Sequence, residues 1–248
     1  MISASPPALR TDEVARHFGT TAALAGVTLA VPGGGWLALV GESGSGKSTL
    51  LRTFNAMVTP DAGQVFVGDA RVADLDPIRL RRHTGYVQQE GGLLPHWTIV
   101  RNTRLVPRLL GRADPDDLAR AALDLVGLPA ARFGDRWPAE LSGGQRQRAA
   151  IARAIAAEPP VLLMDEPFGA LDAITRAELR RAFAGLRGRL DMTLVLVTHD
   201  LAEAFALADR VAVLRSGRLE QVATPADLRA APATAYVEQL LSTAGVAG

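Results

Sequence analysis

The sequence contains no cysteine, which excludes disulfide bonds and thiolate metal ligands and leaves nothing to suggest an oxidising compartment. It also lacks an excess of charge of either sign. The 27 Lys and Arg residues nearly balance the 26 Asp and Glu residues, giving a net charge of +1. This balance gives no bias toward nucleic acid or an anionic membrane, so we expect no nucleic-acid partner.

Long hydrophobic runs are missing as well. No stretch approaches the roughly 18 to 20 apolar residues that a membrane-spanning helix needs. The first residues lack the basic start and apolar run of a secretory signal. We therefore expect a cytoplasmic protein that reaches a membrane only through a partner. Its 248 residues, 48% of them hydrophobic, suffice for one large domain or a domain with a subdomain.

Short apolar runs alternate with helical patterns along most of the chain. Strand patterns occupy residues 27–31, 36–40, 161–164, 193–197 and 218–222. Helical patterns occupy residues 48–57, 145–157, 173–189 and 201–208. Because continuous apolar strands are typical of sheets covered on both faces, this alternation predicts an α/β fold with a mostly parallel sheet.

The middle of the chain is predicted to be mainly helical. Residues 114–117, with the sequence DPDD, predict a helix start, since proline suits the first turn and acidic groups favour the N-terminal end of the helix dipole. We expect a helical subdomain inserted into an α/β core. The predicted parts are a tail at 1–8, a core at 9–92 and 139–241, the helical subdomain at 93–138 and a tail at 242–248.

The motif GESGSGKS at residues 41–48 matches the phosphate-binding pattern G-x-x-x-x-G-K-[ST]. Its glycines let the backbone turn sharply and point N–H groups at phosphate oxygens, and the following helix adds its positive end. Lys47 would bridge the β- and γ-phosphates of a nucleotide, Ser48 would bind Mg²⁺, and Thr49 would contact the α-phosphate. A Gly- and Ser-rich turn that merely contains a lysine is the alternative, which the strand before and the helix after disfavour.

Two carboxylates follow the buried strand pattern that begins at residue 161. They are Asp165 and Glu166, and the carboxyl edge of an open α/β sheet is where such folds bind ligands. Asp165 would hold Mg²⁺ through water, and Glu166 would polarise an attacking water, as phosphoryl transfer requires. A solvated strand end is the alternative, and the phosphate motif in the same chain disfavours it.

The sequence LSGGQRQR at residues 141–148 resembles the signature of ABC-type ATPases, and the resemblance extends from about residue 9 to 241. It implies a P-loop NTPase fold with a mostly parallel core sheet, an antiparallel β subdomain and an inserted helical subdomain, acting on ATP with Mg²⁺. Ser142 and the two glycines after it precede a helix and can offer a phosphate a hydroxyl group and N–H groups. A second phosphate-binding helix start fits the ATP of a second copy, or of a paralogous ATPase, in the family's head-to-tail dimer.

Other positions take roles from the same resemblance. Gln89 aligns with the glutamine that reaches Mg²⁺ and water, and counting back from Leu93 favours it over Gln88. His199 resembles the switch histidine at the γ-phosphate, and Phe18 matches the aromatic that stacks on adenine, with His17 a weaker candidate.

The resemblance therefore implies four sets of site residues. The residues expected to bind the ATP held by the same chain are Phe18, Gly41, Ser43, Gly44, Ser45, Gly46, Lys47, Ser48 and Thr49. Contacts to the ATP of the partner fall to Ser142, Gly143, Gly144, Gln145 and Asp172, the last in a D-loop at 168–172. The residues expected to contact the metal are Ser48, Gln89 and Asp165. The residues expected to act in catalysis are Glu166, His199 and Gln89.

Further resemblances indicate which kind of transporter this ATPase would serve. The segment EGGLLPHWTI at residues 90–99 is similar to importers at the position where a permease docks. Segments 54–57, 85–89, 98–102 and 172–176 resemble ATPases of quaternary-amine importers, which carry glycine betaine, choline or carnitine as osmoprotectants. We therefore expect permease partners, an extracytoplasmic substrate-binding protein reached through them, and a place at the cytoplasmic face of the membrane.

Several alternatives remain at this stage. Another importer ATPase, for amino acids, sulfonates or metals, is the first. An exporter ATPase is disfavoured by the Pro-His stretch, and a ribosomal or DNA-repair ABC protein by the single compact domain. A binding module without hydrolysis is disfavoured by the presence of Lys47, Glu166 and His199.

Overall fold

The computed structural model describes residues 5–89, 91–169, 171–187 and 191–246. It contains two compact units, which we treat separately. The first consists of Met1–Arg81 and Met192–Gly248, and the second of Arg82–Asp191. The first unit thus combines an N-terminal and a C-terminal part of the described chain, residues 5–81 and 192–246.

The first unit contains an antiparallel sheet in the order β2-β1-β4-β5. Its strands are β1 (Leu9–Phe18), β2 (Thr21–Val31), β4 (Ala62–Val67) and β5 (Ala70–Arg71). β1 is irregular, because Glu13 has a φ of 48° and the register with β2 shifts between Thr11 and Val14. This sheet confirms the antiparallel subdomain expected from the family resemblance.

The same unit contains buried parallel strands that lead to the phosphate motif. β3 (Trp36–Val40) pairs in parallel with β8 (Thr193–Val197) and β9 (Arg210–Arg215), and β10 (Arg218–Ala223) is antiparallel to β9. Every residue of β3 and β8 is buried. Both strands have the bounds predicted from their apolar runs.

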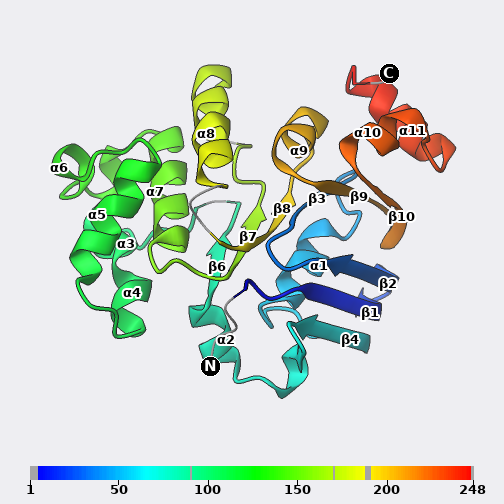
Figure 1. Cartoon of the computed structure of the whole chain (residues 1–248), viewed down its shortest axis with the longest axis horizontal. Helices are drawn as coiled ribbons and strands as arrows, with labels where there is room; N and C mark the ends of the chain where they lie inside the picture. The colour runs from blue at the N-terminus through cyan, green and yellow to red at the C-terminus, as the bar shows by residue number, and fades with distance from the viewer. Residues whose placement is uncertain (1–4, 90, 170, 188–190, 247–248) are drawn as a thin grey trace. The chain divides into compact units, whose positions relative to one another are not determined.

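The same unit contains helices. They are α1 (Lys47–Thr53), the 3-10 helix η1 (Val72–Asp74), α2 (Pro77–Arg82), α9 (Leu201–Leu207), α10 (Pro225–Ala230) and α11 (Ala235–Thr243). Of these, α1, α9 and α10 contact the strands of the parallel sheet. Side chains of α9, α10 and α11 share one core cluster with residues of β3 and β9. Figure 1 shows α10 and α11 in orange and red beside β9 and β10. α1 ends four residues before the predicted bound of 57, and Ala56 beyond it has a φ of 57°.

The second unit combines two parallel strands with helices. β6 (Thr84–Val87) pairs with β7 (Val161–Asp165) in parallel. The helices are α3 (Ile99–Thr103), α4 (Leu105–Leu109), α5 (Pro115–Leu125), α6 (Ala130–Phe133), the 3-10 helix η2 (Pro138–Glu140), α7 (Gly143–Ile155) and α8 (Ala173–Leu186). The predicted helix start at 114–117 is confirmed, since Asp114 is the N-cap of α5 and Pro115 its first residue.

The chain ends are tied to the first unit where they are described. Residues 5–8 have no regular structure, but the Pro7 carbonyl accepts a hydrogen bond of 2.7 Å from the Thr193 hydroxyl. Within the predicted tail at 242–248, α11 continues to Thr243 and Val246 packs against the core cluster. Residues 1–4 and 247–248 of the two predicted tails lie outside the described residues.

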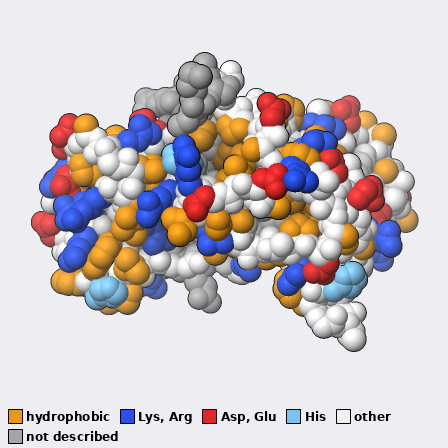
Figure 2. All heavy atoms as spheres, turned by 90° about the horizontal axis from the view of Figure 1, so that it is seen from below, with side chains coloured by type: hydrophobic (Ala, Val, Ile, Leu, Met, Phe, Trp, Pro, Cys, Tyr) orange, Lys and Arg blue, Asp and Glu red, His pale blue; other side chains and the backbone are white. Residues whose placement is uncertain are grey.

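The surface carries both charge signs. Figure 2 shows acidic and basic side chains interspersed over one face, with hydrophobic side chains between them, as the near-zero net charge leads one to expect. In the described ranges, no helix is both long and apolar enough to cross a membrane.

Candidate functional site

The phosphate loop, residues 41–48, connects β3 to α1 in the first unit. Gly46 is the N-cap of α1 with a φ of 100°, and Gly41 has a φ of 143°. A Cβ atom on Gly41 would lie 2.1 Å from the Leu214 carbonyl oxygen, and one on Gly46 would lie 2.3 Å from the Ala23 carbonyl oxygen. Both positions therefore require glycine for conformation and for space.

Lys47 lies inside this loop with 6% of its surface exposed. Its ammonium group donates hydrogen bonds to the carbonyl oxygens of Gly41 (2.9 Å) and Glu42 (2.7 Å), and to the Ser45 hydroxyl (3.3 Å). These acceptors are neutral, and a phosphate oxygen would be a stronger partner for the same charge. The loop thus holds a buried cation beside N–H groups that belong to a helix start.

His199 lies at the same edge of the parallel strands as the phosphate loop. β8 runs parallel to β3 with Leu39 opposite Val197, so residues after both strands emerge at one edge. The Thr198 N–H donates to the Leu39 carbonyl at 3.2 Å, and the His199 side chain is exposed. Two of the predicted site elements are therefore neighbours within the first unit.

A polar network around His199 was not predicted. The Thr198 hydroxyl donates to the buried Glu203 carboxylate at 2.6 Å and accepts from the Asp200 N–H at 3.0 Å. The Asp200 carboxylate caps α9 by accepting from the N–H groups of Ala202 and Glu203. The network fixes the backbone on both sides of His199. The D-x-x-E spacing of Asp200 and Glu203 is the sequence signal that indicates such a helix start.

Phe18, the predicted adenine-stacking residue, ends β1 with 51% of its surface exposed. The Arg16 guanidinium lies 4.9 Å from its ring centroid and is held by an ion pair of 2.6 Å with Asp61. Asp61 also accepts a hydrogen bond of 2.7 Å from the His17 N–H. This hydrogen bond is the main cause that lowers the pKa of the Asp61 carboxyl group, and the nearby charge of Arg16 lowers it further. An exposed aromatic ring backed by a cation is suited to stacking on a planar ligand.

The second unit brings Gln89 and Glu166 together. Because β6 and β7 are parallel with Val87 opposite Met164, the residues after both strands share one edge. The Gln89 amide donates to the Glu166 carboxylate at 3.2 Å. Asp165, the last residue of β7, is fully buried, and Glu166 takes the left-handed backbone conformation with a φ of 47°.

Gln88 has a different position from Gln89. A Cβ atom built on Gly92 would lie 1.7 Å from the Gln88 amide nitrogen, so this amide packs against Gly92 within its own loop. Gln89 is the residue whose side chain reaches the acidic strand end. The geometry therefore fits the preference for Gln89. The following residue, Glu90 in the predicted docking segment 90–99, lies outside the described residues.

The signature segment forms a helix start in the second unit. Ser142 is the N-cap of α7, its hydroxyl accepts from the Gln145 N–H, and the Gln145 side chain accepts from the Ser142 N–H at 3.0 Å. A Cβ atom on Gly144 would lie 3.2 Å from side-chain atoms of Leu171 and Thr175. The first turn of this 13-residue helix is thus held closely to the segment around Leu171.

Asp172 caps the next helix. Its exposed carboxylate accepts from the Thr175 N–H at 2.9 Å, and this hydrogen bond lowers the pKa of the carboxyl group. The neighbouring Ala170, part of the predicted D-loop at 168–172, lies outside the described residues.

The predicted metal ligands have oxygen atoms to offer, namely a hydroxyl of Ser48, an amide of Gln89 and a carboxylate of Asp165. Among the described residues, no group of three or more His, Cys, Asp or Glu side chains is placed to hold a metal. Mg²⁺ usually takes one or two carboxylates, waters and substrate phosphates instead of a full protein cage. Each of these donors is therefore of a chemical type that suits Mg²⁺ bound together with a nucleotide.

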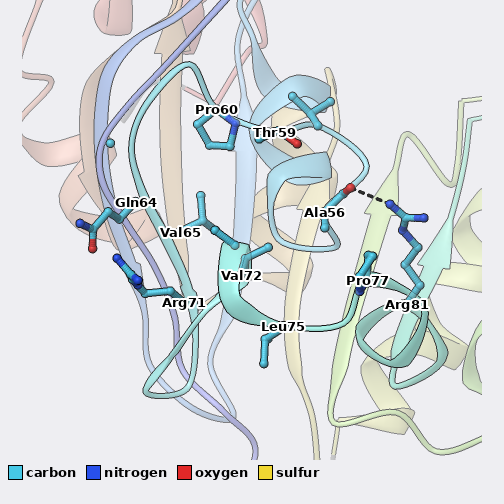
Figure 3. A pocket seen from close by; sticks show the side chains of 13 residues that line it. Ala56, Thr59, Pro60, Gln64, Val65, Arg71, Val72, Leu75, Pro77 and Arg81 are labelled. Atoms are coloured by element: carbon cyan, nitrogen blue, oxygen red, sulfur yellow. Dashed lines mark hydrogen bonds between the residues drawn. The ribbon is translucent and has the colours of Figure 1, made fainter.

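A cavity of about 520 Å³ lies elsewhere in the first unit and contains none of these residues (Figure 3). Its lining is largely apolar, with Val65, Val72 and Leu75 among the labelled side chains. Its two arginines are engaged: Arg71 pairs with Asp74 at 2.8 Å, and Arg81 donates to backbone carbonyl groups. Among the described residues that line it, no convergent set of polar groups indicates a phosphate site.

A glycine-rich loop with a buried lysine between a parallel strand and a helix defines a nucleotide-binding protein of the P-loop class. Residues 24–169 match the family model described as ABC transporter. The chain therefore belongs to the ABC transporter family, and the family resemblance seen in its sequence is confirmed.

Curated relatives include transport and import ATP-binding proteins. The chain is 45% identical over 236 residues to the choline transport ATP-binding protein OpuBA of Bacillus subtilis, covering 94% of the chain and 62% of the relative. It is 45% identical over 213 residues to the osmoprotectant import ATP-binding protein OsmV of Salmonella typhimurium, covering 85% and 56%. It is 46% identical over 229 residues to the sulfate/thiosulfate import ATP-binding protein CysA of Bradyrhizobium diazoefficiens, covering 90% and 65%. The chain thus spans about three fifths of the length of these relatives.

Solved structures agree in fold. The dimeric structure of MJ0796, a bacterial ABC transporter cassette, matches with a TM-score of 0.81 at 32% identity, covering 87% of this chain and 98% of that one. A post-hydrolysis state of the same cassette bound to ADP and Pi matches with a TM-score of 0.80. The predicted fold class, a P-loop NTPase with a mostly parallel core sheet, is confirmed.

Proposed function

We propose that this chain hydrolyses ATP as the motor subunit of an ABC importer for quaternary-amine osmoprotectants. The observation that carries the hydrolytic part is the hydrogen bond of 3.2 Å between Gln89 and Glu166 at a strand end, in a chain that also holds a complete phosphate loop. A carboxylate beside an amide at the end of a buried strand can orient a water for attack on a phosphate.

Each predicted residue has a role in this proposal. The loop N–H groups and Lys47 bind the phosphates, while Phe18 stacks on adenine. Mg²⁺, held by Ser48, Gln89 and Asp165, would neutralise phosphate charge when bound. Glu166 orients the attacking water, and His199, fixed by its polar network, contacts the γ-phosphate.

The proposed active form contains two copies, or one copy and a paralogous ATPase. Ser142, Gly143, Gly144, Gln145 and Asp172 would act on the ATP held by the partner. Two observations support this division. The chain has a second helix start of the anion-binding type, at α7, and a cassette 32% identical to it has a dimeric structure.

Glu166→Gln tests the hydrolytic assignment. The amide keeps the size of the carboxylate but cannot accept a proton, so we expect ATP binding to persist while turnover falls at least about 100-fold, the range for a removed general base. The measurement is phosphate release per chain, beside the affinity for a fluorescent ATP analogue and the molecular mass with ATP. An ATPase rate equal to that of the wild type would refute the role of Glu166.

The importer proposal draws on the relatives' names and on the motifs at 85–89, 98–102 and 172–176. Permease subunits and, through them, an extracytoplasmic binding protein complete it, with this chain at the cytoplasmic face of the membrane. The similar identity to CysA keeps sulfate/thiosulfate import as a second candidate.

Uptake separates these two substrate classes. With its permease and binding protein in liposomes, the complex should accumulate labelled glycine betaine or choline in an ATP-dependent manner. Accumulation of sulfate alone would favour the second candidate instead.

A further inference from the structure

The phosphate loop is braced by segments that follow β8 in the chain. The Gly217 N–H donates to the Ser45 carbonyl at 3.0 Å, and the Leu214 carbonyl packs against Gly41. These two contacts use only backbone atoms. The third contact is made by a side chain, since the Glu42 N–H donates to the hydroxyl group of Tyr236 in α11 at 3.2 Å.

The bond from Tyr236 acts on one particular peptide group. The Gly41–Glu42 peptide is trans, so its carbonyl and N–H groups point in opposite directions. The Gly41 carbonyl accepts from the Lys47 ammonium group at 2.9 Å, while the N–H of the same peptide donates to Tyr236. This peptide is therefore held from both sides, and its rotation would break both hydrogen bonds.

Tyr236 is itself firmly placed. It is 7% exposed and belongs to the core cluster that includes Val40 and Val213. The Arg215 guanidinium lies 4.6 Å from its ring centroid. Burial raises the pKa of the Tyr236 hydroxyl above its usual value of 10.0, so the group stays neutral around pH 7. A rigid side chain is what a positioning role requires.

The same helix also supports His199 indirectly. The core cluster that contains Tyr236 includes Leu201 and Ala204 of α9, the helix that begins directly after the His199 turn. α11 therefore packs against α9, the helix that follows His199. Through Tyr236, it also makes a hydrogen bond to the phosphate loop.

We propose that Tyr236 is a positioning residue for the phosphate loop, and that its hydroxyl group keeps the Gly41–Glu42 peptide oriented for Lys47. The proposal rests on the proposed nucleotide-binding function. The Lys47 ammonium group has three N–H donors, so it can keep the Gly41 carbonyl as one acceptor while another donor turns to an ATP phosphate. Without the hydroxyl group, the peptide gains orientations that ATP must then select against, which lowers affinity.

Tyr236→Phe tests this role because it keeps the ring, its burial and its contact with Arg215. Loss of one neutral hydrogen bond corresponds to about 2- to 10-fold weaker binding of ATP. We expect the Kd of a fluorescent ATP analogue and the KM for ATP to rise by this factor, while kcat stays within about twofold. Hydrogen exchange of the Glu42 amide should become faster in the nucleotide-free chain.

Thr243→Val is the matched control. It also removes a hydroxyl group from α11, one that donates to the Gln239 carbonyl at 2.8 Å. This control should leave both the Kd and the exchange at Glu42 unchanged.

The outcomes separate this proposal from the proposed function. If the wild-type chain binds ATP and Tyr236→Phe binds it equally well with unchanged exchange at Glu42, the positioning role is wrong. An equal loss of affinity in Thr243→Val would also overturn it, because the effect would then belong to the helix as a whole. If the wild type does not bind ATP, the proposed function fails, and the exchange at Glu42 still decides whether Tyr236 holds the peptide.

Discussion

Single residues decide whether the phosphate loop can form. Gly46 combines a φ of 100° with a close approach to the Ala23 carbonyl, so it meets a conformational and a spatial demand at once. Lys47 is buried among carbonyl groups of the same loop, which keeps its charge next to the helix start. These local features are the ones that the motif pattern encodes, and this is why the loop was found from the sequence.

Gly46→Ala should disable the loop. The substitution forces a side chain into the left-handed region, at a cost of about 1–2 kcal/mol, and also places Cβ 2.3 Å from the Ala23 carbonyl oxygen. We expect ATP binding to weaken by about 5- to 30-fold, because the loop shifts to relieve this strain and ATP must bring it back to its binding shape. Titration with a fluorescent ATP analogue measures it.

Gly34→Ala serves as the control for backbone strain alone. Gly34 has a φ of 75° but nothing within 4 Å of its built Cβ atom, and it lies before β3, away from the phosphates. It should lower the thermal midpoint without changing the Kd for ATP. If both variants bind ATP like the wild type, the loop does not depend on glycine at position 46.

At the level of helices and strands, the sequence pattern predicted β3 and β8 but missed β1 and the largely buried strands β6 and β9. β3 and β8 have the predicted bounds because all their residues are buried and their sequences are continuous apolar runs. β1 was not predicted, since its bulge at Glu13 breaks the alternation that marks a half-buried strand. The helix expected at 173–189 is described to Leu186, and residues 188–190 lie outside the described residues.

The same contrast holds for the candidate site. The phosphate loop, the acidic strand end and the signature are each continuous in sequence, so their spacing alone indicates them. Tyr236 lies 194 positions from Glu42, and no local pattern connects the two. Glu203 is an intermediate case, because its spacing from Asp200 indicates a helix start but not the bond to Thr198. Contacts that depend on the packing of distant segments become visible only in the fold.

For the whole molecule, we propose that one chain carries two phosphate-binding helix starts. The first follows Gly46 in the first unit, and the second follows Ser142 in the second unit. Our central claim is that these two starts act on the same ATP only across a dimer. A chain that lacks one of them should then be rescued by a chain that lacks the other, since a closed two-fold dimer has two such sites.

Mixing two inactive variants tests this claim most directly. One chain carries Lys47→Ala and the other Ser142→Asp, which keeps an N-cap residue but sets a negative charge against the phosphate. Both also carry Glu166→Gln, so that ATP-bound dimers accumulate. Neither variant alone should form dimers with ATP. In an equal mixture, half of the dimers should contain one chain of each kind and therefore one intact site of two, so about a quarter of all sites should be intact. ATP-dependent dimers in the mixture, detected by light scattering after size-exclusion chromatography, are the predicted result. A mixture that stays monomeric with ATP, while the Glu166→Gln parent dimerises, would contradict the shared site.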